Sequence, residues 1–138
     1  MTVVLVPPDR VGAVWPHVAA RMAKAAAVLG HYDEADIRAA AERGDWTLWA
    51  EVEGGRVTAA ALTEVDDKPR MRVLWVVYAV GENAEAVNRL WPAVRVHARM
   101  LGCRQVIGLL RRGFFRAGKP HADWRPMGDV GVAEVPDG

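Results

Sequence analysis

The stretch Met71–Ala84 constrains the fold of this chain more than any other part of its sequence. An apolar run, Arg72–Val80, leads through Gly81-Glu82-Asn83 directly into a segment with helical periodicity. Because the run is apolar at consecutive positions, we expect a central strand that is buried on both faces. The sequence therefore predicts a sheet that is covered on both sides.

The junction between this strand and the following helix is a candidate anion site. A strand that ends at a glycine and a helix N-terminus leaves backbone N–H groups unpaired at the positive end of the helix dipole. We therefore predict that Val80, Gly81, Glu82, Asn83 and Ala84 bind a phosphate-bearing ligand. The alternative needs no ligand: Gly81 supplies a turn and Asn83 caps the helix. Glu82 favours the helix dipole but would repel a phosphate.

Length, composition and charge bound the class of protein. The chain has 138 residues, 51% of them hydrophobic and 25% charged, which fits one domain over residues 1–138. A net charge of +1 makes nucleic acid and membrane surfaces unlikely partners. The single cysteine, Cys103, excludes an intrachain disulfide and fits a reducing compartment. The N-terminal apolar run is too short for a signal peptide. No apolar run in the sequence approaches the roughly 18 residues that a membrane span needs. We expect a cytoplasmic protein.

The first third of the chain shows a strand followed by helical periodicity. Thr2–Val6 is a short apolar run that two prolines close, which predicts a strand and a turn. Apolar residues at helical spacing then predict a helix capped by Asp9 and ended by Gly30. A second helix is predicted between a cap at Asp33 and a stop at Gly44.

The middle of the chain changes to an alternating pattern that predicts three strands. Trp46–Val52 alternates with period two and runs into the tight turn Gly54-Gly55. Val57–Val65 forms the returning strand, and Asp66–Pro69 forms a second turn. Met71–Val80 follows as the central strand.

The last third returns to helix and strand. A helix is predicted over Ala84–Leu101, with a kink at Pro92, where a backbone hydrogen bond is lost. Val106–Leu110 predicts a strand, Arg111–Gly118 a short helix or turn, and Val130–Val135 a final strand. The order β-α-α-β-β-β-α-β-α-β predicts an α/β (α+β) fold with a mostly antiparallel sheet and helices on both faces.

This order of elements resembles the fold of the GNAT N-acetyltransferases over nearly the whole chain. The motifs that support it are Gly44-Asp45-Trp46-Thr47-Leu48-Trp49, the Gly54-Gly55 hairpin, the junction at Gly81, Arg112-Gly113-Phe114 and Gly118. The chain looks most like the small GNAT-like proteins of phage, prophage and gene-transfer clusters. Those often carry the motifs found here as Trp15-Pro16, Leu48-Trp49 and Leu101-Gly102-Cys103.

The resemblance implies a splayed sheet, with acetyl-CoA between the central strand and the next one. Its pyrophosphate would lie on the loop that opens the following helix, which in the family usually reads Arg/Gln-x-x-Gly-x-Gly/Ala. Here only Gly81 and the backbone of Glu82, Asn83 and Ala84 correspond, because the basic or amide residue and the second glycine are missing. Backbone amides can bind phosphate without the full motif.

Two functions follow from the resemblance. The first is an acyltransferase that moves an acetyl group from acetyl-CoA to an amine acceptor, largely by positioning. The second is a non-catalytic phage or gene-transfer-particle protein that reuses the fold in a virion or in its assembly. The oligomeric state and the acceptor stay open.

The sequence assigns no catalytic residue. Tyr78, near the end of the central strand, is either a general acid, a lining residue or a tyrosine that packs in the sheet. Glu64 is not nominated as a general base. A turn at Asp66–Pro69 pairs it near Met71, about 23 Å along the strand from Tyr78 at ~3.3 Å per residue.

Other polar and aromatic groups give weaker signals. The four histidines and Cys103 lack metal-ligand spacing, so no metal site is predicted. Trp49 or Trp124, if exposed, would suggest a protein interface. A basic region could contact the adenosine phosphate of CoA, a nucleic acid or an acidic protein, or could be a solvated surface. It comprises Arg111, Arg112, Arg116, Lys119 and Arg125.

Overall fold

The computed structural model describes residues 1–109, 124–127 and 130–135. In this part of the chain seven strands form a single sheet in the order β1-β2-β3-β4-β5-β7-β6. Neighbouring strands are antiparallel except β4 and β5, which are parallel. The strands are β1 (Thr2–Val6), β2 (Thr47–Glu53), β3 (Arg56–Asp67), β4 (Arg72–Gly81), β5 (Cys103–Leu109), β6 (Trp124–Met127) and β7 (Val130–Glu134).

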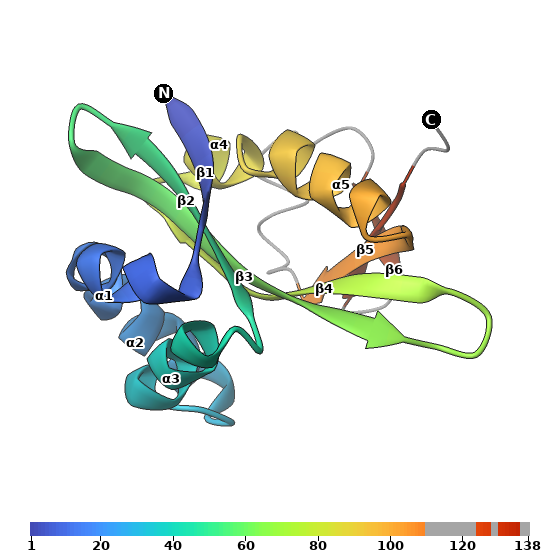
Figure 1. Ribbon diagram of the computed structural model, residues 1–138, viewed down its shortest axis with the longest axis horizontal. Helices are drawn as coiled ribbons and strands as arrows, with labels where there is room; N and C mark the ends of the chain where they lie inside the picture. Colours follow the sequence, from blue (N-terminus) through green and yellow to red (C-terminus); the bar gives the residue numbers. More distant parts are fainter. Residues whose placement is uncertain (110–123, 128–129, 136–138) are drawn as a thin grey trace.

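Helices cover both faces of the sheet, as predicted (Figure 1). One core, around Trp15 and Leu62, lies under the N-terminal helices, and the other, around Leu74 and Trp91, lies under α4 and α5. None of the helices in the described ranges is long and apolar enough to span a membrane. The helical segments are η1 (Pro8–Arg10), α1 (Val11–Val14), η2 (Trp15–His17), α2 (Ala19–Leu29), α3 (Glu34–Arg43), α4 (Ala84–Asn88) and α5 (Trp91–Met100).

Prolines divide two helices that periodicity predicted as continuous. The first is interrupted by the 3-10 turn that contains Pro16, and the second stops after Asn88 and restarts at Trp91. Pro92 therefore lies in the first turn of a new helix, where its missing N–H costs nothing, instead of kinking an existing one. The predicted cap at Asp9 is wrong, because this residue lies inside η1 and its side chain caps neither η1 nor α1.

Local signals fix the boundaries of α3 and of the first hairpin. The N–H of Asp36 donates to Asp33 Oδ1 at 2.8 Å, and the N–H of Asp33 donates to Asp36 Oδ2 at 3.0 Å, which is a capping box. The helix ends at Gly44, whose φ is +79°. The Gly54-Gly55 turn joins β2 to β3. These predictions are confirmed.

The second hairpin is longer than predicted, and this changes the position of Glu64. β3 continues to Asp67, which pairs with Arg72, so Glu64 lies opposite Trp75 and not near Met71. The two aspartates that favoured a turn have partners inside the ladder. Asp67 accepts from Arg72 Nε at 2.6 Å, and Asp66 accepts from Trp75 Nε1 at 3.2 Å. Their charge is therefore compatible with an extended strand.

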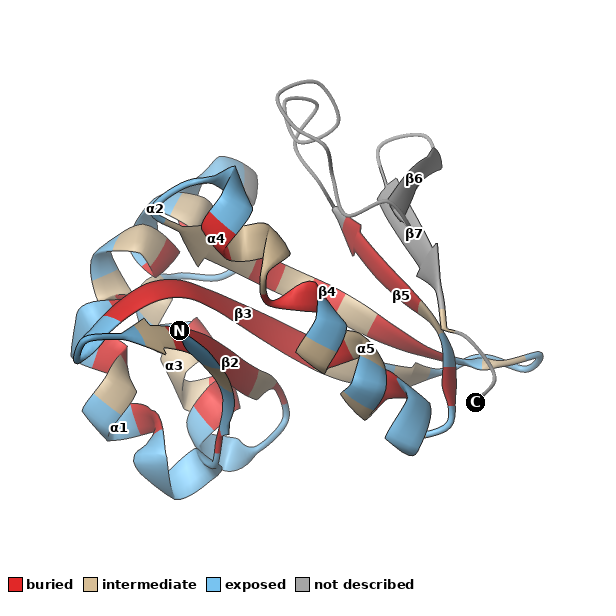
Figure 2. Ribbon diagram, turned by 90° about the horizontal axis from the view of Figure 1, so that it is seen from above, coloured by how far each residue is buried: buried red, intermediate tan, exposed pale blue. Residues whose placement is uncertain are grey.

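A β-bulge lies in the middle of the central strand. Leu62 pairs with Tyr78 and Thr63 pairs with Val76, so Val77 is an extra residue in β4. The parallel pairing of β4 with β5 ends at the same level, with Val76 opposite Gly108. Beyond that point the described residues pair β4 with β3 alone, while β5 continues to Leu109 beside β7. Figure 2 shows the two strands adjacent at one end and apart at the other, which confirms the splayed sheet.

The C-terminal part contains one strand that the sequence did not predict. β7 is confirmed, and β5 begins three residues earlier than predicted, at Cys103. Trp124–Met127, for which the sequence predicted no strand, pairs with β7 as the edge strand β6. The predicted short helix or turn over Arg111–Gly118 lies outside the described residues, as does most of the basic region.

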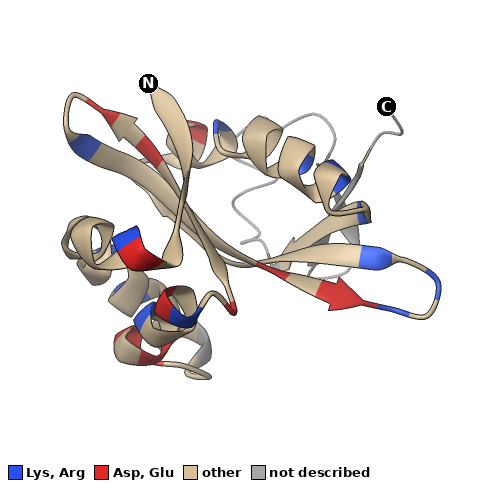
Figure 3. Ribbon diagram, viewed as in Figure 1, with Lys and Arg blue, Asp and Glu red and all other residues tan. Residues whose placement is uncertain are grey.

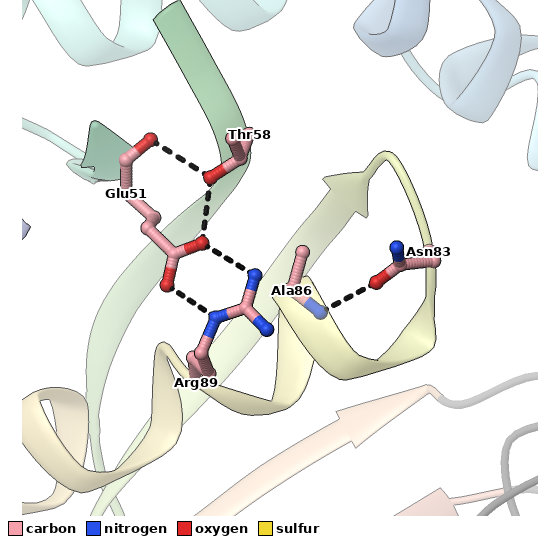
Figure 4. A network of polar contacts seen from close by, with 5 residues as sticks. All are labelled: Glu51, Thr58, Asn83, Ala86 and Arg89. Atoms are coloured by element: carbon pink, nitrogen blue, oxygen red, sulfur yellow. Dashed lines mark hydrogen bonds and ion pairs between the residues drawn. The ribbon is translucent and has the colours of Figure 1, made fainter. Parts of the chain in front are cut away.

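A buried ion pair joins β2 to the segment after α4 (Figure 4). Arg89 donates to Glu51 from Nε at 2.8 Å and from Nη2 at 2.9 Å, and the Thr58 hydroxyl donates to Glu51 Oε1 at 2.6 Å. Thr58 is itself the extra residue of a second bulge, between the pairs Glu51–Ala59 and Val52–Val57. The Glu51 side chain is only 1% exposed. The network holds α4 against the bulged part of β3.

The hydrogen bonds from Arg89 lower the pKa of Glu51 below its ordinary value of 4.5, against the opposing effect of burial. The hydroxyl of Thr58 lowers this pKa further. The Glu51 side chain is therefore a buried carboxylate at neutral pH.

Gly81 lies where β4, β3 and α4 meet at close range. A Cβ atom there would lie 2.8 Å from Val87 Cγ2 and 3.2 Å from both Ala59 Cβ and the Thr58 carbonyl oxygen. The next N–H, that of Glu82, donates to the same carbonyl at 2.9 Å. Glycine is therefore required here by packing.

We predict that Gly81→Ala lowers the free energy of unfolding by about 2 kcal/mol, because the added methyl overpacks the junction. Adding Val87→Ala should recover part of this loss, since it removes the closest clash. Gly12→Ala is the matched control, because a Cβ there meets only Arg38 Nη2, at 3.6 Å. Urea unfolding measures all four proteins, and equal effects of the two glycine substitutions would contradict the packing argument.

We predict that Glu51→Gln destabilises the protein by about 2 kcal/mol at neutral pH, because Arg89 loses its buried anion. A carboxyl group with a lowered pKa contributes stability above its unfolded pKa and loses it as the pH falls through the folded pKa. The gap in Tm between wild type and Glu51→Gln should therefore be largest near neutral pH and should close below about pH 4.5.

Glu42→Gln is the control for this measurement, because Glu42 forms an exposed pair with Arg38 on α3. It should shift Tm little at any pH. A Tm gap for Glu51→Gln that does not change with pH would show that the carboxylate charge is not what stabilises the network.

Candidate functional site

The five residues predicted to bind a phosphate lie together where β4 ends and α4 begins. Val80 and Gly81 are the last residues of β4, and Ala84 is the first residue of α4. The side chain of Asn83 caps the helix by accepting from the N–H of Ala86 at 2.8 Å, as the alternative interpretation predicted (Figure 4). Among the described residues, nothing accepts a hydrogen bond from the N–H groups of Ala84 and Glu85.

The carboxylate of Glu82 is partly neutralised. Arg56, at the start of β3, forms an ion pair with it, with Nη1 2.8 Å from Oε1. Both side chains are partly solvent-exposed, so the pair contributes little to stability. It does offset the negative charge that would oppose an anion at the helix N-terminus.

An open groove of about 650 Å³ lies on the other side of the sheet, between α3 and the ends of β2 and β3. A smaller pocket of about 120 Å³ continues from it along β4. We call them the acidic groove and the inner pocket. The groove is lined by Tyr32, Asp36, Ala39, Ala40, Arg43, Asp45, Trp46 and Glu64. The pocket is lined by His31, Tyr32, Glu64, Trp75, Val76, Val77 and Tyr78.

The bulge decides which side chains line the inner pocket. Trp75 and Tyr78 are three positions apart, so in a regular strand they would point to opposite faces. The extra residue Val77 resets the alternation, and both side chains line the same pocket. The pocket therefore lies at the level where β4 separates from β5.

Aromatic rings connect the groove to the pocket. Trp46 packs edge-on against Tyr32, with ring centroids 5.1 Å apart, and lies 6.3 Å from the ring of Tyr78. Trp46 Nε1 donates to Glu64 Oε2 at 2.9 Å. This hydrogen bond fixes the carboxylate of Glu64 at the boundary between the acidic groove and the inner pocket.

Tyr78 is 7% exposed, yet its hydroxyl has no hydrogen-bond partner among the described residues. The hydroxyl oxygen itself is not fully buried, because it reaches the open space of the inner pocket. Burial raises the pKa of Tyr78, and the nearby Tyr32 raises it further. The phenol is therefore neutral at physiological pH and can donate a proton into the pocket that it lines.

The predicted pairing that argued against Glu64 as a general base was wrong. It rested on a pairing near Met71, whereas Glu64 pairs with Trp75 and lines the same pocket as Tyr78. The signal that sequence reasoning lacked is the bulge at Val77, because a bulge in an apolar strand leaves no mark in the pattern of side chains. The sequence also did not show that β3 extends to Asp67, which sets the strand pairing of Glu64.

The remaining candidates lie away from this site. Trp49 is buried and packs edge-on against His97 of α5, with ring centroids 5.1 Å apart, so it offers no exposed interface. Burial lowers the pKa of His97 and raises the pKa of the Cys103 thiol, which is inert in the core as expected. Within the described ranges, no three metal-ligating side chains cluster. The side chain of Trp124 is outside the described part.

The sequence matches no protein-family model and no curated protein. Its fold, in contrast, matches solved structures. Aminoglycoside 6'-acetyltransferase type Ii superimposes with a TM-score of 0.74 over 99% of both chains at 8% identity. Ribosomal-protein-alanine N-acetyltransferase from Brucella melitensis biovar Abortus 2308 gives 0.66 at 12% identity, over 92% of this chain and 97% of the other. A probable acetyltransferase gives 0.65 at 9% identity, over 85% and 87%.

At these identities the likeness concerns the fold. The parallel β4–β5 pair that splays after a bulge, with helices on both faces of a mostly antiparallel sheet, agrees with it. The chain has the fold of the GNAT N-acetyltransferases, as the order of its elements predicted.

Proposed function

We propose that this protein is an acyltransferase that transfers the acetyl group of acetyl-CoA to an amine. The observation that carries the proposal is the separation of β4 from β5 beyond Val76 and Gly108, beside the inner pocket. Among the described residues, β4 has no parallel neighbour from Val77 to Gly81. Some of its backbone N–H and C=O groups therefore face the opening between β4 and β5. An extended ligand with amide groups, such as the pantetheine arm of CoA, can pair with such an edge.

The pyrophosphate of the same ligand would lie at the start of α4. The N–H groups of Ala84 and Glu85 are available there, and the ion pair with Arg56 offsets the charge of Glu82. We propose that the junction formed by Val80, Gly81, Glu82, Asn83 and Ala84 shapes this position. The N–H groups of Ala84 and Glu85 are the donors, because the N–H of Glu82 already donates to the Thr58 carbonyl. The loop departs from the usual family motif, so the backbone of β4 has to supply a larger share of the binding.

The chemistry needs an amine nitrogen, a thioester and two proton transfers. The nitrogen attacks the thioester carbonyl carbon, a C–N bond forms and the C–S bond breaks. We propose that Glu64 accepts the proton that the amine loses, directly or through a water. Tyr78 then supplies the proton that the departing thiolate takes up. Holding both reactants in place accounts for the rest of the rate.

The non-catalytic alternative, a phage or gene-transfer-particle component, is not favoured. The three solved structures named above are described as acetyltransferases, one of them as a probable one, and none of these descriptions supports the resemblance to phage proteins. A cytoplasmic location fits the proposed use of acetyl-CoA as donor.

The first test is calorimetric titration with acetyl-CoA. Ala84→Glu places a carboxylate at the helix N-terminus, where it suits the helix dipole but repels a phosphate. We expect micromolar binding by wild type, and binding weaker by about tenfold in Ala84→Glu at unchanged or higher Tm. Ala84→Gln, its neutral isostere, should bind like wild type.

Gly81 is not a usable probe of the same question, because a side chain there disrupts packing. Absence of binding to wild type at millimolar acetyl-CoA would overturn the proposed function. Equal binding by Ala84→Glu and Ala84→Gln would place the pyrophosphate elsewhere.

The second test concerns proton donation by Tyr78. Tyr78→Phe removes only a hydroxyl that has no partner among the described residues, so the fold should keep its Tm. We expect kcat to fall by about 100-fold with acetyl-CoA affinity unchanged. Because the pKa of Tyr78 is raised above 10.0, wild-type activity should persist to strongly alkaline pH before it declines. Unchanged kcat in Tyr78→Phe would remove Tyr78 from the mechanism.

A further inference from the structure

The acidic groove carries an excess of negative charge. Asp36, Asp45 and Glu64 line it, against one cation, Arg43. That cation is already engaged, because Arg43 Nε lies 2.9 Å from Asp45 Oδ2. Figure 3 shows acidic positions on α3 and on the far half of β3, the two elements between which the groove runs. The net charge of the whole chain is only +1, so this is a local feature.

Aromatic surface accompanies the charge. Tyr32 is 44% exposed, packs edge-on against Trp46, and lines both the groove and the pocket. Rings beside carboxylates suit an organic cation, which gains attraction from the ring faces as well as from the charges. An apolar chain between two charges could lie along the same surface.

The acidic groove and the inner pocket together form a continuous path, and an independent observation concerns its inner end. Tyr78 is nine-tenths buried and lines the inner pocket, with its hydroxyl lacking a partner among the described residues. Glu64 belongs to both the groove and the pocket. The path therefore has a reactive end at Tyr78 and Glu64, and a charged end at Asp36 and Asp45.

We propose that the acyl acceptor is a small aliphatic amine with a second positive charge, a diamine or a polyamine. This inference rests on the proposed function. One nitrogen loses its proton at Glu64 and is acetylated, while the other stays protonated and is held by Asp36 and Asp45. The two nitrogens need opposite protonation states, and the site offers a proton acceptor at one end and fixed carboxylates at the other.

Three acceptors of equal chain length test the proposal: 1,4-diaminobutane, n-butylamine and 4-aminobutanoate. They share a four-carbon skeleton and differ at the far end, which is a charged aminomethyl group, a neutral methyl group or a carboxylate. We expect kcat/KM to fall by about tenfold from 1,4-diaminobutane to n-butylamine, and by about tenfold again from n-butylamine to 4-aminobutanoate. The preference for the diamine should weaken with added salt, because the groove is open. Equal kcat/KM for the diamine and butylamine would overturn the proposal.

Variants locate the charged end. The double variant Asp36→Asn with Asp45→Asn should abolish the preference for 1,4-diaminobutane, leaving butylamine unaffected. Arg43→Gln should increase the preference, because it removes the competing cation. Glu42→Gln changes the same charge on α3 without lining the groove and should have no effect. A double variant that slows both amines equally would contradict the assignment. Tm checks the fold, since Asp36 also belongs to the capping box.

Direct titration separates this inference from the proposed function. If acetyl-CoA binds but the amines are not distinguished, the acceptor inference fails and the acyltransferase stands. If acetyl-CoA does not bind, the acyltransferase fails. In that case, calorimetry with 1,4-diaminobutane alone tests whether the acidic groove binds a diamine. Saturable binding that the double variant loses supports a diamine site, and binding no stronger than that of butylamine overturns it.

Discussion

The extra residue Val77 in β4 is the constraint on which the rest of the site depends. It ends the parallel pairing with β5 and turns part of the central strand into an open edge. It also resets the alternation of side chains, so that Trp75 and Tyr78 line the same pocket. One inserted residue thus accompanies both an open backbone edge on β4 and a pocket lined by side chains from the same strand.

Keeping β4 open at one edge requires the other edge to be held firmly. β3 supplies this through a long antiparallel ladder, and α4 is held over its bulged part by the pair between Glu51 and Arg89. Gly81 lets the end of β4 approach Val87 and the Thr58 carbonyl at distances where an added Cβ atom would be crowded. The structure around the proposed phosphate position is therefore held by packing and hydrogen bonds that require no ligand.

The two faces of the sheet have different polar features. Under α4 and α5, the buried carboxylate of Glu51 is fully paired and its lowered pKa stabilises the fold. On the face of α2 and α3, Glu64 and Tyr78 keep unused hydrogen-bonding capacity beside a pocket. A buried charge that is fully paired stabilises the fold. Polar side chains with free hydrogen-bonding capacity beside a cavity are instead where a ligand-binding site is expected.

The sequence by itself determined most elements of this protein and their order, although it did not show β6 or the breaks in two helices. The capping box at Asp33, the Gly54-Gly55 turn and the unbroken apolar run of β4 act through neighbours in the chain, and all three were predicted. These local signals were enough to identify the fold and the junction at Gly81. They were also enough to expect that Asn83 caps the following helix.

Only the tertiary structure decided the register of β3 against β4, and with it the site. Two aspartates favoured an earlier turn, and that turn puts Glu64 near Met71, about seven positions from Tyr78. At ~3.3 Å per strand residue this is about 23 Å. In the fold those aspartates pair with Arg72 and Trp75, across the hairpin. Strand pairing and bulges are set by contacts between distant residues, and a shift of one residue moves every side chain to the other face. No local pattern contains that information.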